Sequence, residues 1–260
     1  MLWGDGFDTQ ELLAPRVEGL KTIPGLAPAT VNRRTQLLGQ AFRLAVDAGR
    51  LAFMPHVRHL SEVGNVRRGF FERAEFDAVV DALPAYLRDF ARFGYVTGWR
   101  KGEISAVRWA DVDGEAVRLR GEDAKNRQGR SVPLEGELAA IIERRRAARL
   151  FKTKAGTAAL AEYVFHRGDG EPIREFRKSW ATACTAAGVS GRLFHDLRRT
   201  AARNLVRAGA PETVAMVVTG HKTRAVFQRY AIASERDVRE ALAKSQALTA
   251  QEGQAWPFCR

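Results

Sequence analysis

The sequence predicts a mainly α-helical protein with a small antiparallel β-sheet, an α+β fold. Apolar residues recur every three or four positions through most of the chain, as on one face of a helix. Two short alternating segments, residues 116–119 and 131–134, flank the polar stretch GEDAKNRQG and are typical of an antiparallel hairpin. Residues 55–69 show no period and are interpreted as a linker, so we predict a domain boundary near residue 68.

The part before this boundary carries one predicted helix, at residues 30–48. Thr30 is a suitable N-cap, and Gly49 follows the last apolar position. Glycine and proline interrupt any period before Pro28. We therefore predict three parts, namely a partial helical region at 1–68, a larger domain at 69–245 and a C-terminal tail at 246–260.

The larger domain is expected to place helices on both sides of its hairpin. The spacing of apolar residues predicts helices at residues 70–83, 84–95, 99–107, 136–151, 173–188, 195–208, 211–218 and 224–231. A further short alternating segment lies at residues 107–109, and the stretch up to Ser245 fits one more helix.

Composition favours a partner with many negative charges. The 260 residues include 42 Lys and Arg against 30 Asp and Glu, a net charge of +12. Nucleic acid is the most frequent partner of so basic a chain, although a membrane surface or ribosome-like binding also fits. Two cysteines are too few for a disulfide scaffold or a cysteine-built zinc site. With no membrane-spanning run and no signal peptide, we expect a soluble cytoplasmic protein without a membrane partner.

The positive charge is concentrated near the C-terminal end of the larger domain. Residues 192–230 hold eight Arg and Lys but only Asp196 and Glu212, which leaves +6, half of the net charge. Any single arginine in this stretch is compatible with a solvated helix face, and we favour that interpretation for Arg203 and Arg207. The stretch as a whole predicts a phosphate-binding surface.

Four short strings in this domain carry residues that suit phosphate chemistry. They are TGWRKGE with Arg100, DAKNRQG with Lys125, FHDLRRT with His195 and Arg198, and TGHKTRAVFQRY with His221 and Tyr230. Their order and spacing resemble the tyrosine recombinase (phage integrase) family, whose catalytic set runs Arg, Lys, His-x-x-Arg, His or Trp, then Tyr. Each string alone is weak, but the ordered set is specific. The resemblance covers residues 70–245, about two-thirds of the chain.

The residue types themselves favour a reaction at a phosphodiester without metal. Such cleavage needs a nucleophile, stabilisation of charge on the non-bridging oxygens and a proton for the leaving oxygen. The chain has no dense acidic cluster for two metal ions, and His56 and His59 lack a third ligand nearby. Arginine suits phosphate because its planar fork donates two parallel hydrogen bonds. His195 and Arg198, three apart on a predicted helix, share one face.

Tyr230 is the best nucleophile among the four tyrosines. Tyr86 and Tyr95 lie in apolar helical surroundings and Tyr163 precedes an apolar segment, so we expect these three in the core. Tyr230 follows Arg229 on the most basic stretch. A free phenol has a pKa of about 10 and needs positive surroundings to attack as phenolate.

The resemblance implies a role for each residue of the set. Tyr230 would attack a DNA phosphate and form a 3′-phosphotyrosine, without metal, ATP or other cofactor. Arg100, Arg198 and His221 would hold the non-bridging oxygens, Lys125 would protonate the leaving oxygen, and His195 would assist proton transfer. Glu103 resembles the acidic residue that orders the cations, although a simple surface pair with Arg100 fits equally well. Predicted DNA-binding residues are Arg33, Arg34, Arg199, Lys222, Arg224 and Arg229.

The implied function is a site-specific DNA recombinase or integrase acting on double-stranded DNA. The resemblance implies a homotetramer on two DNA sites, with accessory DNA-bending or directionality proteins as further partners. Trp256 and Phe258 in the tail would serve docking onto a neighbouring protomer. The family usually has about four helices before the catalytic domain, so we expect a shortened core-binding region here. A truncated DNA-binding relic, a topoisomerase-like enzyme and a helix-turn-helix regulator remain alternatives, although the last leaves the Tyr, Lys and Arg set unexplained.

Overall fold

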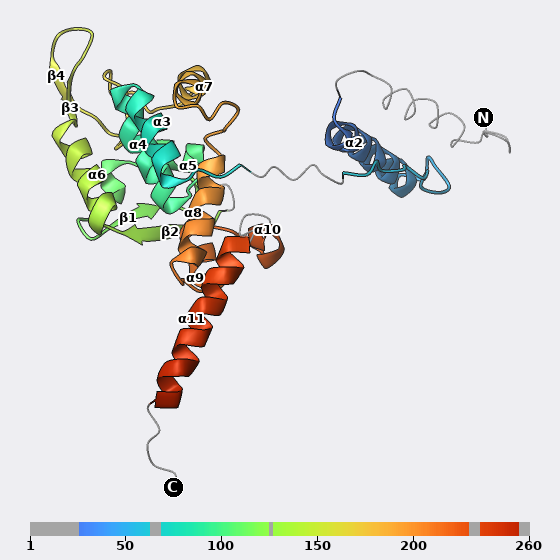
Figure 1. Ribbon diagram of the computed structural model, residues 1–260. Helices are drawn as coiled ribbons and strands as arrows, with labels where there is room; N and C mark the ends of the chain where they lie inside the picture. The colour runs from blue at the N-terminus through green and yellow to red at the C-terminus, as the bar shows by residue number, and fades with distance from the viewer. Residues whose placement is uncertain (1–25, 63–68, 125–126, 229–234, 255–260) are drawn as a thin grey trace. The chain divides into compact units, whose positions relative to one another are not determined.

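The computed structural model describes residues 26–62, 69–124, 127–228 and 235–254. The chain divides into two compact units, residues 1–67 and 68–260, which are described separately. Figure 1 labels the helices and strands along the chain. Among the described residues, no helix is long and apolar enough to cross a membrane.

The first unit contains helix α2 (Pro28–Asp47). The sequence had suggested Thr30 as the N-cap. This prediction is wrong, because the helix begins at Pro28 and its N-cap residue is Ala27. Proline suits this position since its fixed φ fits the first turn and its missing N–H needs no partner. Asn32 fastens the following segment to the helix by exchanging hydrogen bonds with the backbone of Leu60 (2.9 and 2.7 Å).

The second unit is built around helix α4. Its helices are α3 (Arg73–Ala82), α4 (Ala85–Thr97), α5 (Lys101–Ala106), α6 (Gly136–Ala147), α7 (Arg177–Ala186), α8 (Asp196–Arg207), α9 (Glu212–Thr219), α10 (Arg224–Gln228) and α11 (Glu235–Gln254). Helix α4 packs against α3, α5, α6 and α8. The mainly helical fold class is therefore confirmed.

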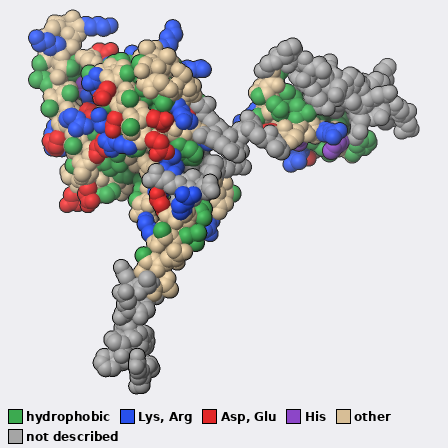
Figure 2. Space-filling model, in the orientation of Figure 1, with side chains coloured by type: hydrophobic (Ala, Val, Ile, Leu, Met, Phe, Trp, Pro, Cys, Tyr) green, Lys and Arg blue, Asp and Glu red, His purple; other side chains and the backbone are tan. Residues whose placement is uncertain are grey.

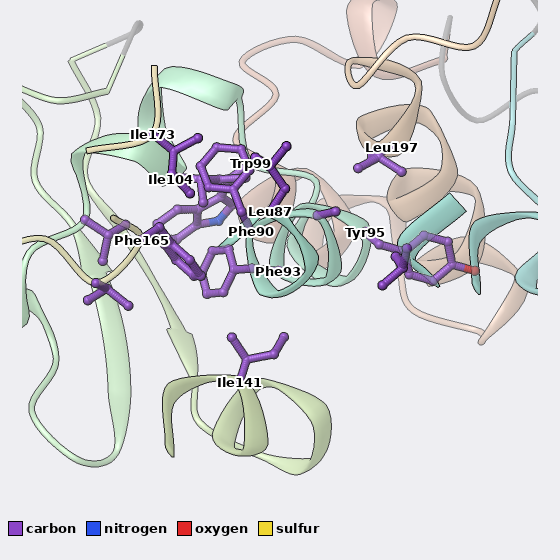
Figure 3. Close-up of a cluster of buried hydrophobic side chains, with 14 of the residues drawn as sticks. Leu87, Phe90, Phe93, Tyr95, Trp99, Ile104, Ile141, Phe165, Ile173 and Leu197 are labelled. Carbon is purple, nitrogen blue, oxygen red and sulfur yellow. The ribbon is translucent and has the colours of Figure 1, made fainter. Parts of the chain in front are cut away.

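Aromatic side chains form the centre of this core. Phe90 and Phe93 of α4 meet the ring of Phe165 edge-on, with centroids 5.7 and 5.2 Å apart. Phe93 also contacts Trp99 (5.4 Å), and all four side chains are almost completely buried. Figure 3 shows these rings beside Ile104 and Ile173. The core thus reaches the C-terminal end of α4, where the segment around Trp99 begins.

Two antiparallel hairpins complete the second unit. Strands β1 (Ala116–Leu119) and β2 (Arg130–Pro133) pair as expected, with Leu119 opposite Arg130. Strands β3 (Leu150–Lys152) and β4 (Ala158–Leu160) form a second hairpin that was not predicted. The expected helix at 136–151 ends earlier, at Ala147. Strong helix formers continue through this region, so only the pairing with β4 reveals the strand.

Other elements differ from expectation mainly at their ends. Helix α7 begins at Arg177 rather than near residue 173, because Ile173 is fully buried in an extended segment. Trp109, which was expected to end an alternating segment at residues 107–109, instead begins a short 3-10 helix, Trp109–Asp111. Helix α11 continues to Gln254 instead of ending at Ser245. Residues 246–252 contain no Gly or Pro, so nothing local stops the helix.

Candidate active site

The ends of helices α4 and α9 form the base of the site. Each ends at a glycine in the left-handed region, Gly98 (φ 65°) and Gly220 (φ 70°). A Cβ on Gly98 would lie 2.9 Å from the Cβ of Ala201, so a larger residue would not fit. The indole Nε1 of Trp99 donates a hydrogen bond to the carbonyl oxygen of Val218 (3.2 Å), which joins the two turns.

Arg100 follows Trp99 and caps helix α5 together with Glu103. One carboxylate oxygen of Glu103 accepts the backbone N–H of Arg100 (2.8 Å), and the other accepts its Nη1 (2.8 Å). The Glu103 side chain is 2% exposed and that of Arg100 27%. The carboxylate is thus buried, which contradicts the alternative of a simple surface pair.

Arg130 also binds this carboxylate, although none of the motifs in the sequence includes it. Its Nη2 lies 2.5 Å from Oε2 of Glu103. Burial alone would raise the pKa of Glu103, but the backbone N–H of Arg100 and the charge of Arg130 hold that pKa below its usual value. The carboxylate therefore stays ionised between two arginines. Arg130 precedes the recognisable strand pattern by one residue, and this position is the only sequence signal for it.

Arg198 connects the two turns from helix α8. Its Nη1 donates to the carbonyl oxygens of Gly98 (2.8 Å) and Thr219, and its Nη2 to that of Gly220 (3.2 Å). The residue is 2% exposed. The guanidinium is therefore fixed at the junction of α4, α8 and α9.

His221 lies against the same junction and is neutral at physiological pH. The Thr219 hydroxyl donates its proton to the carbonyl of Ala215 and lies 2.7 Å from Nδ1 of His221. Nδ1 must therefore be the donor in that contact, because a hydroxyl has one proton. Burial, with the charges of Arg198, Arg100, His195 and Arg130, lowers the pKa of His221 to about 3.

His195 and those predicted DNA-binding residues that the structure describes lie nearer to the surface. His195 is the N-cap residue of α8, and partial loss of water around its ring, followed by the charge of Arg198, lowers its pKa. Arg199 is half-buried, whereas Lys222 and Arg224 are exposed. Nε of Arg224 pairs with Glu212 (2.7 Å). On α2, Arg33 and Arg34 are exposed.

The structure thus brings together four predicted residues and leaves others undescribed. Arg100, Glu103, Arg198 and His221 share one cluster, and His195 acts on His221 through its charge. Five residues named from the sequence lie outside the described residues, namely Lys125, Arg229, Tyr230, Trp256 and Phe258. In the described part of the chain, no three His, Cys, Asp or Glu side chains gather as metal ligands.

Arg203 was expected on a solvated face and is instead buried. Its side chain is 8% exposed, with Nη1 on Glu72 (2.7 Å) and Nη2 on the carbonyl oxygen of Phe71 (3.0 Å). The first residues of the second unit cover this part of α8. Figure 2 shows basic side chains mixed with acidic ones over the visible face of the second unit.

A cavity of about 470 Å³ opens beside the cluster. Arg130, Gly220 and His221 line one part of it, and Met216 and Val217 of α9 line another. The cluster is therefore not sealed inside the core.

Comparisons with known proteins agree with this geometry. The model of the phage integrase family matches residues 71–236. The integrase of Salmonella phage P22 is 26% identical over 180 residues, covering 64% of this chain and 44% of that protein. A tyrosine recombinase XerC-like protein of Caldanaerobacter subterraneus is 26% identical over 235 residues, covering 76% of this chain and 60% of the relative. The chain spans about half the length of these curated relatives.

Solved structures share the fold of the second unit. A lambda integrase dimer bound to a COC′ core site has a TM-score of 0.69 at 20% identity, covering 86% of this chain and 64% of that one. XerH recombinase bound to palindromic difH substrate has a TM-score of 0.69 at 15% identity, covering 90% and 71%. The helical body with its small antiparallel sheets is the catalytic-domain fold of tyrosine recombinases. The chain belongs to the phage integrase family.

Proposed function

We propose that this chain is a site-specific DNA recombinase that breaks and rejoins strands through a 3′-phosphotyrosine at Tyr230. One observation carries the proposal: Arg100, Arg198 and His221 meet where the Gly98 and Gly220 turns are joined. Burial, followed by the charges of Arg198, Arg100 and other nearby cations, lowers the pKa of the His221 ring to about 3. Among the described residues, the Glu103 carboxylate binds both Arg100 and Arg130. So positive a pocket suits a phosphate diester.

Each cationic residue has a distinct task in this proposal. Arg100 and Arg198 hold the non-bridging oxygens and stabilise the charge that develops in the pentavalent transition state. His221 is neutral before DNA binds, so Nε2 accepts hydrogen bonds. The negative charge of a bound phosphate favours protonation of the ring, after which His221 can donate to a phosphate oxygen.

The bond changes balance without a metal or a nucleotide cofactor. The phenol oxygen of Tyr230 attacks phosphorus, and the bond from phosphorus to the 5′-oxygen breaks. Lys125 gives the leaving oxygen its proton, and His195 assists removal of the phenol proton. A 5′-hydroxyl of a partner strand then attacks the phosphotyrosine, which restores the phenol. The ester conserves the bond energy between the two steps.

Binding along DNA is assigned to exposed cations outside the cluster. Arg199, Lys222, Arg224 and Arg229 of the second unit, and Arg33 and Arg34 of α2, would contact backbone phosphates. The partner is double-stranded DNA, and the active assembly is a homotetramer on two sites. The solved lambda integrase complexes, a dimer on a core site and a tetramer on a Holliday junction, support this assembly. Accessory DNA-bending or directionality proteins complete the set of proposed partners.

Covalent trapping tests the proposal directly. The protein is mixed with sheared genomic DNA from its source and quenched in detergent, and protein-linked fragments are sequenced. Tyr230→Phe removes the nucleophile, and Tyr163→Phe is the matched control because it changes another tyrosine of the same unit. We expect adducts at one locus with wild type and Tyr163→Phe, and none with Tyr230→Phe.

Other outcomes select the alternatives. Adducts at random positions would favour a topoisomerase-like enzyme. DNA binding without any adduct, also in a version with an extended N-terminus, would indicate a DNA-binding relic.

A further inference from the structure

Arg130 lies at the base of the hairpin whose connecting stretch contains Lys125. It is the first residue of β2 and pairs with Leu119, the last residue of β1. Its side chain does not point to solvent, since only 6% of it is exposed. None of the roles above uses this arginine, yet its guanidinium lies inside the cluster.

The guanidinium of Arg130 contacts two residues that surround Arg100, namely its acidic partner Glu103 and the preceding residue Trp99. Nη2 of Arg130 lies 2.5 Å from the Glu103 oxygen that also accepts the backbone N–H of Arg100. The carbon of the guanidinium lies 4.8 Å from the ring centroid of Trp99, the residue before Arg100. Arg130 therefore restrains both the acidic partner of Arg100 and the preceding residue.

A third contact ties Arg130 to the turn before His221. A Cβ on Gly220 would lie 2.5 Å from Nη1 of Arg130 and 2.7 Å from its Cζ. Only glycine allows the backbone to approach so closely. The carbonyl of the same glycine accepts Nη2 of Arg198 (3.2 Å). Arg130 thus packs against the segments that hold Arg100, Arg198 and His221.

This arrangement is costly for stability. Burial, and the charge of Arg100, lower the pKa of Arg130, while Glu103 opposes that effect. Within the described residues, Nε and Nη1 of Arg130 are buried and have no hydrogen-bond partner. Replacing a whole buried ion pair by apolar side chains is often neutral or stabilising, although removing one partner alone is destabilising because the other charge stays buried. A contribution to stability therefore does not account for the ion pair, whereas a contribution to the geometry of the site does.

We propose that Arg130 is a positioning residue for DNA cleavage. It fixes the Glu103 carboxylate and the Trp99 ring so that Arg100 is held ready for phosphate, and it joins the base of the hairpin to the Gly220 turn. Although Arg130 lines part of the cavity beside the cluster, its role is assigned through Arg100, because its Nη2 is bound to Glu103 and its Nε and Nη1 are buried. The proposal rests on the recombinase function proposed above.

The test compares three variants on the DNA site recovered by trapping. Arg130→Met removes the charge and keeps the length, whereas Arg130→Lys keeps the charge without the planar fork. Arg145→Met is the matched control, since Arg145 is also buried but donates to the carbonyls of Val164 (3.0 Å) and His166 (3.4 Å), outside the cluster. Single-turnover cleavage of a nicked duplex gives the rate at saturating DNA, and titration gives Kd.

We expect Arg130→Met to cleave about 10- to 100-fold more slowly, with Kd changed by no more than about twofold, because a misplaced group weakens catalysis more than binding. Arg130→Lys should recover part of the rate, and Arg145→Met should cleave at the wild-type rate. Equal rates for Arg130→Met and wild type would overturn the proposal. An equal loss in Arg145→Met, or a loss of affinity parallel to the loss of rate, would overturn it as well.

A DNA-free measurement separates this proposal from the recombinase function. If wild type forms no adduct, the proposed function fails. The restraint of Glu103 by Arg130 is then tested by the unfolding midpoints of three variants, Arg130→Met, Glu103→Gln and the double variant. Arg130→Lys replaces Arg130→Met if the latter does not fold. Non-additive midpoints are expected because both side chains share one contact. Additive midpoints would overturn the proposal.

Discussion

Two pairs of buried arginines in the second unit differ in what surrounds them. Arg145 and Arg203 each bind backbone carbonyls, and Arg203 also binds Glu72, with no second cation in these bonds. Arg130 and Arg198 also bind local groups, but their charges add to that of Arg100 around one neutral imidazole, that of His221. Burial of an arginine therefore does not by itself point to a functional site, whereas convergence of several cations on one ring favours one.

The strongest contrast is between Arg198 and Arg203, one turn and a half apart on α8. Arg198→Met should lower the cleavage rate by at least about 10²- to 10³-fold, because charge on the phosphate loses a fixed donor. Arg203→Met should leave the rate unchanged and lower the free energy of unfolding by about 1–2 kcal/mol, since its partner Glu72 is 62% exposed. Cleavage rates and urea unfolding check both. Similar rates for the two variants would abolish the distinction between the pairs.

A pH series tests whether the field on His221 is as positive as the geometry indicates. The folded-state pKa of about 3 lies below that of an unfolded histidine, about 6.5. Between pH 3 and 6.5 the unfolded chain therefore binds more protons at this histidine than the folded chain does. The contribution of neutral His221 to the free energy of unfolding is fully present above pH 6.5 and is lost as the pH falls toward 3. His221 should contribute about 3 kcal/mol of this loss between pH 6.5 and 4.

Urea unfolding of wild type and His221→Gln at several pH values isolates this contribution. The glutamine variant should show a shallower loss of stability with acid, because it has no imidazole to protonate. Parallel curves for the two proteins would mean that His221 titrates normally and that the cluster is not strongly cationic.

Two glycines separate crowding from backbone conformation. Gly220 and Gly209 both have positive φ (70° and 84°), but only Gly220 has a side chain, that of Arg130, in the way of a Cβ. Gly209→Ala should cost about 1 kcal/mol for the left-handed conformation alone. Gly220→Ala should cost about 1–2 kcal/mol more and slow cleavage, because Arg130 must move. Thermal unfolding compares the two, and equal losses would contradict close packing on Arg130.

The smallest effect is expected outside the cluster, at exposed Lys222. Lys222→Ala should weaken DNA binding and reduce the slope of log K against log salt by about one, without changing the cleavage rate at saturating DNA. Fluorescence titration at several salt concentrations measures this slope. An unchanged slope would remove Lys222 from the DNA-binding surface.

Helix positions and part of the cluster could be predicted from local patterns. Apolar spacing located α3, α4 and α8, and the polar stretch between two alternating segments located the hairpin of β1 and β2. The motifs around Arg100, Arg198 and His221 can also be recognised, each within a short stretch of the sequence. Their meeting in one cluster followed from the family resemblance rather than from spacing.

What sequence reasoning missed depends on contacts between distant segments. Arg203 looks exposed in its own helix and is buried because Phe71, 132 residues earlier, lies on it. Arg130 looks like an ordinary strand residue until Glu103 and Gly220 enclose its guanidinium. The strand at Leu150 forms only by pairing with a later strand, against strong local helix formers. The spacing of apolar residues within one helix or strand does not show which distant segments pack against it.

The bonds of Arg198 also have a consequence for the order in which the protein becomes competent. The arginine joins a carbonyl 100 residues earlier, at Gly98, to carbonyls 21 and 22 residues later. A nascent chain that ends within α8, after Arg198, therefore contains this arginine and its acceptor at Gly98 but lacks the two later acceptors, at Thr219 and Gly220. Synthesis must pass Gly220 before Arg198 can reach all three carbonyls, so the cationic cluster can close only after most of the second unit has been made.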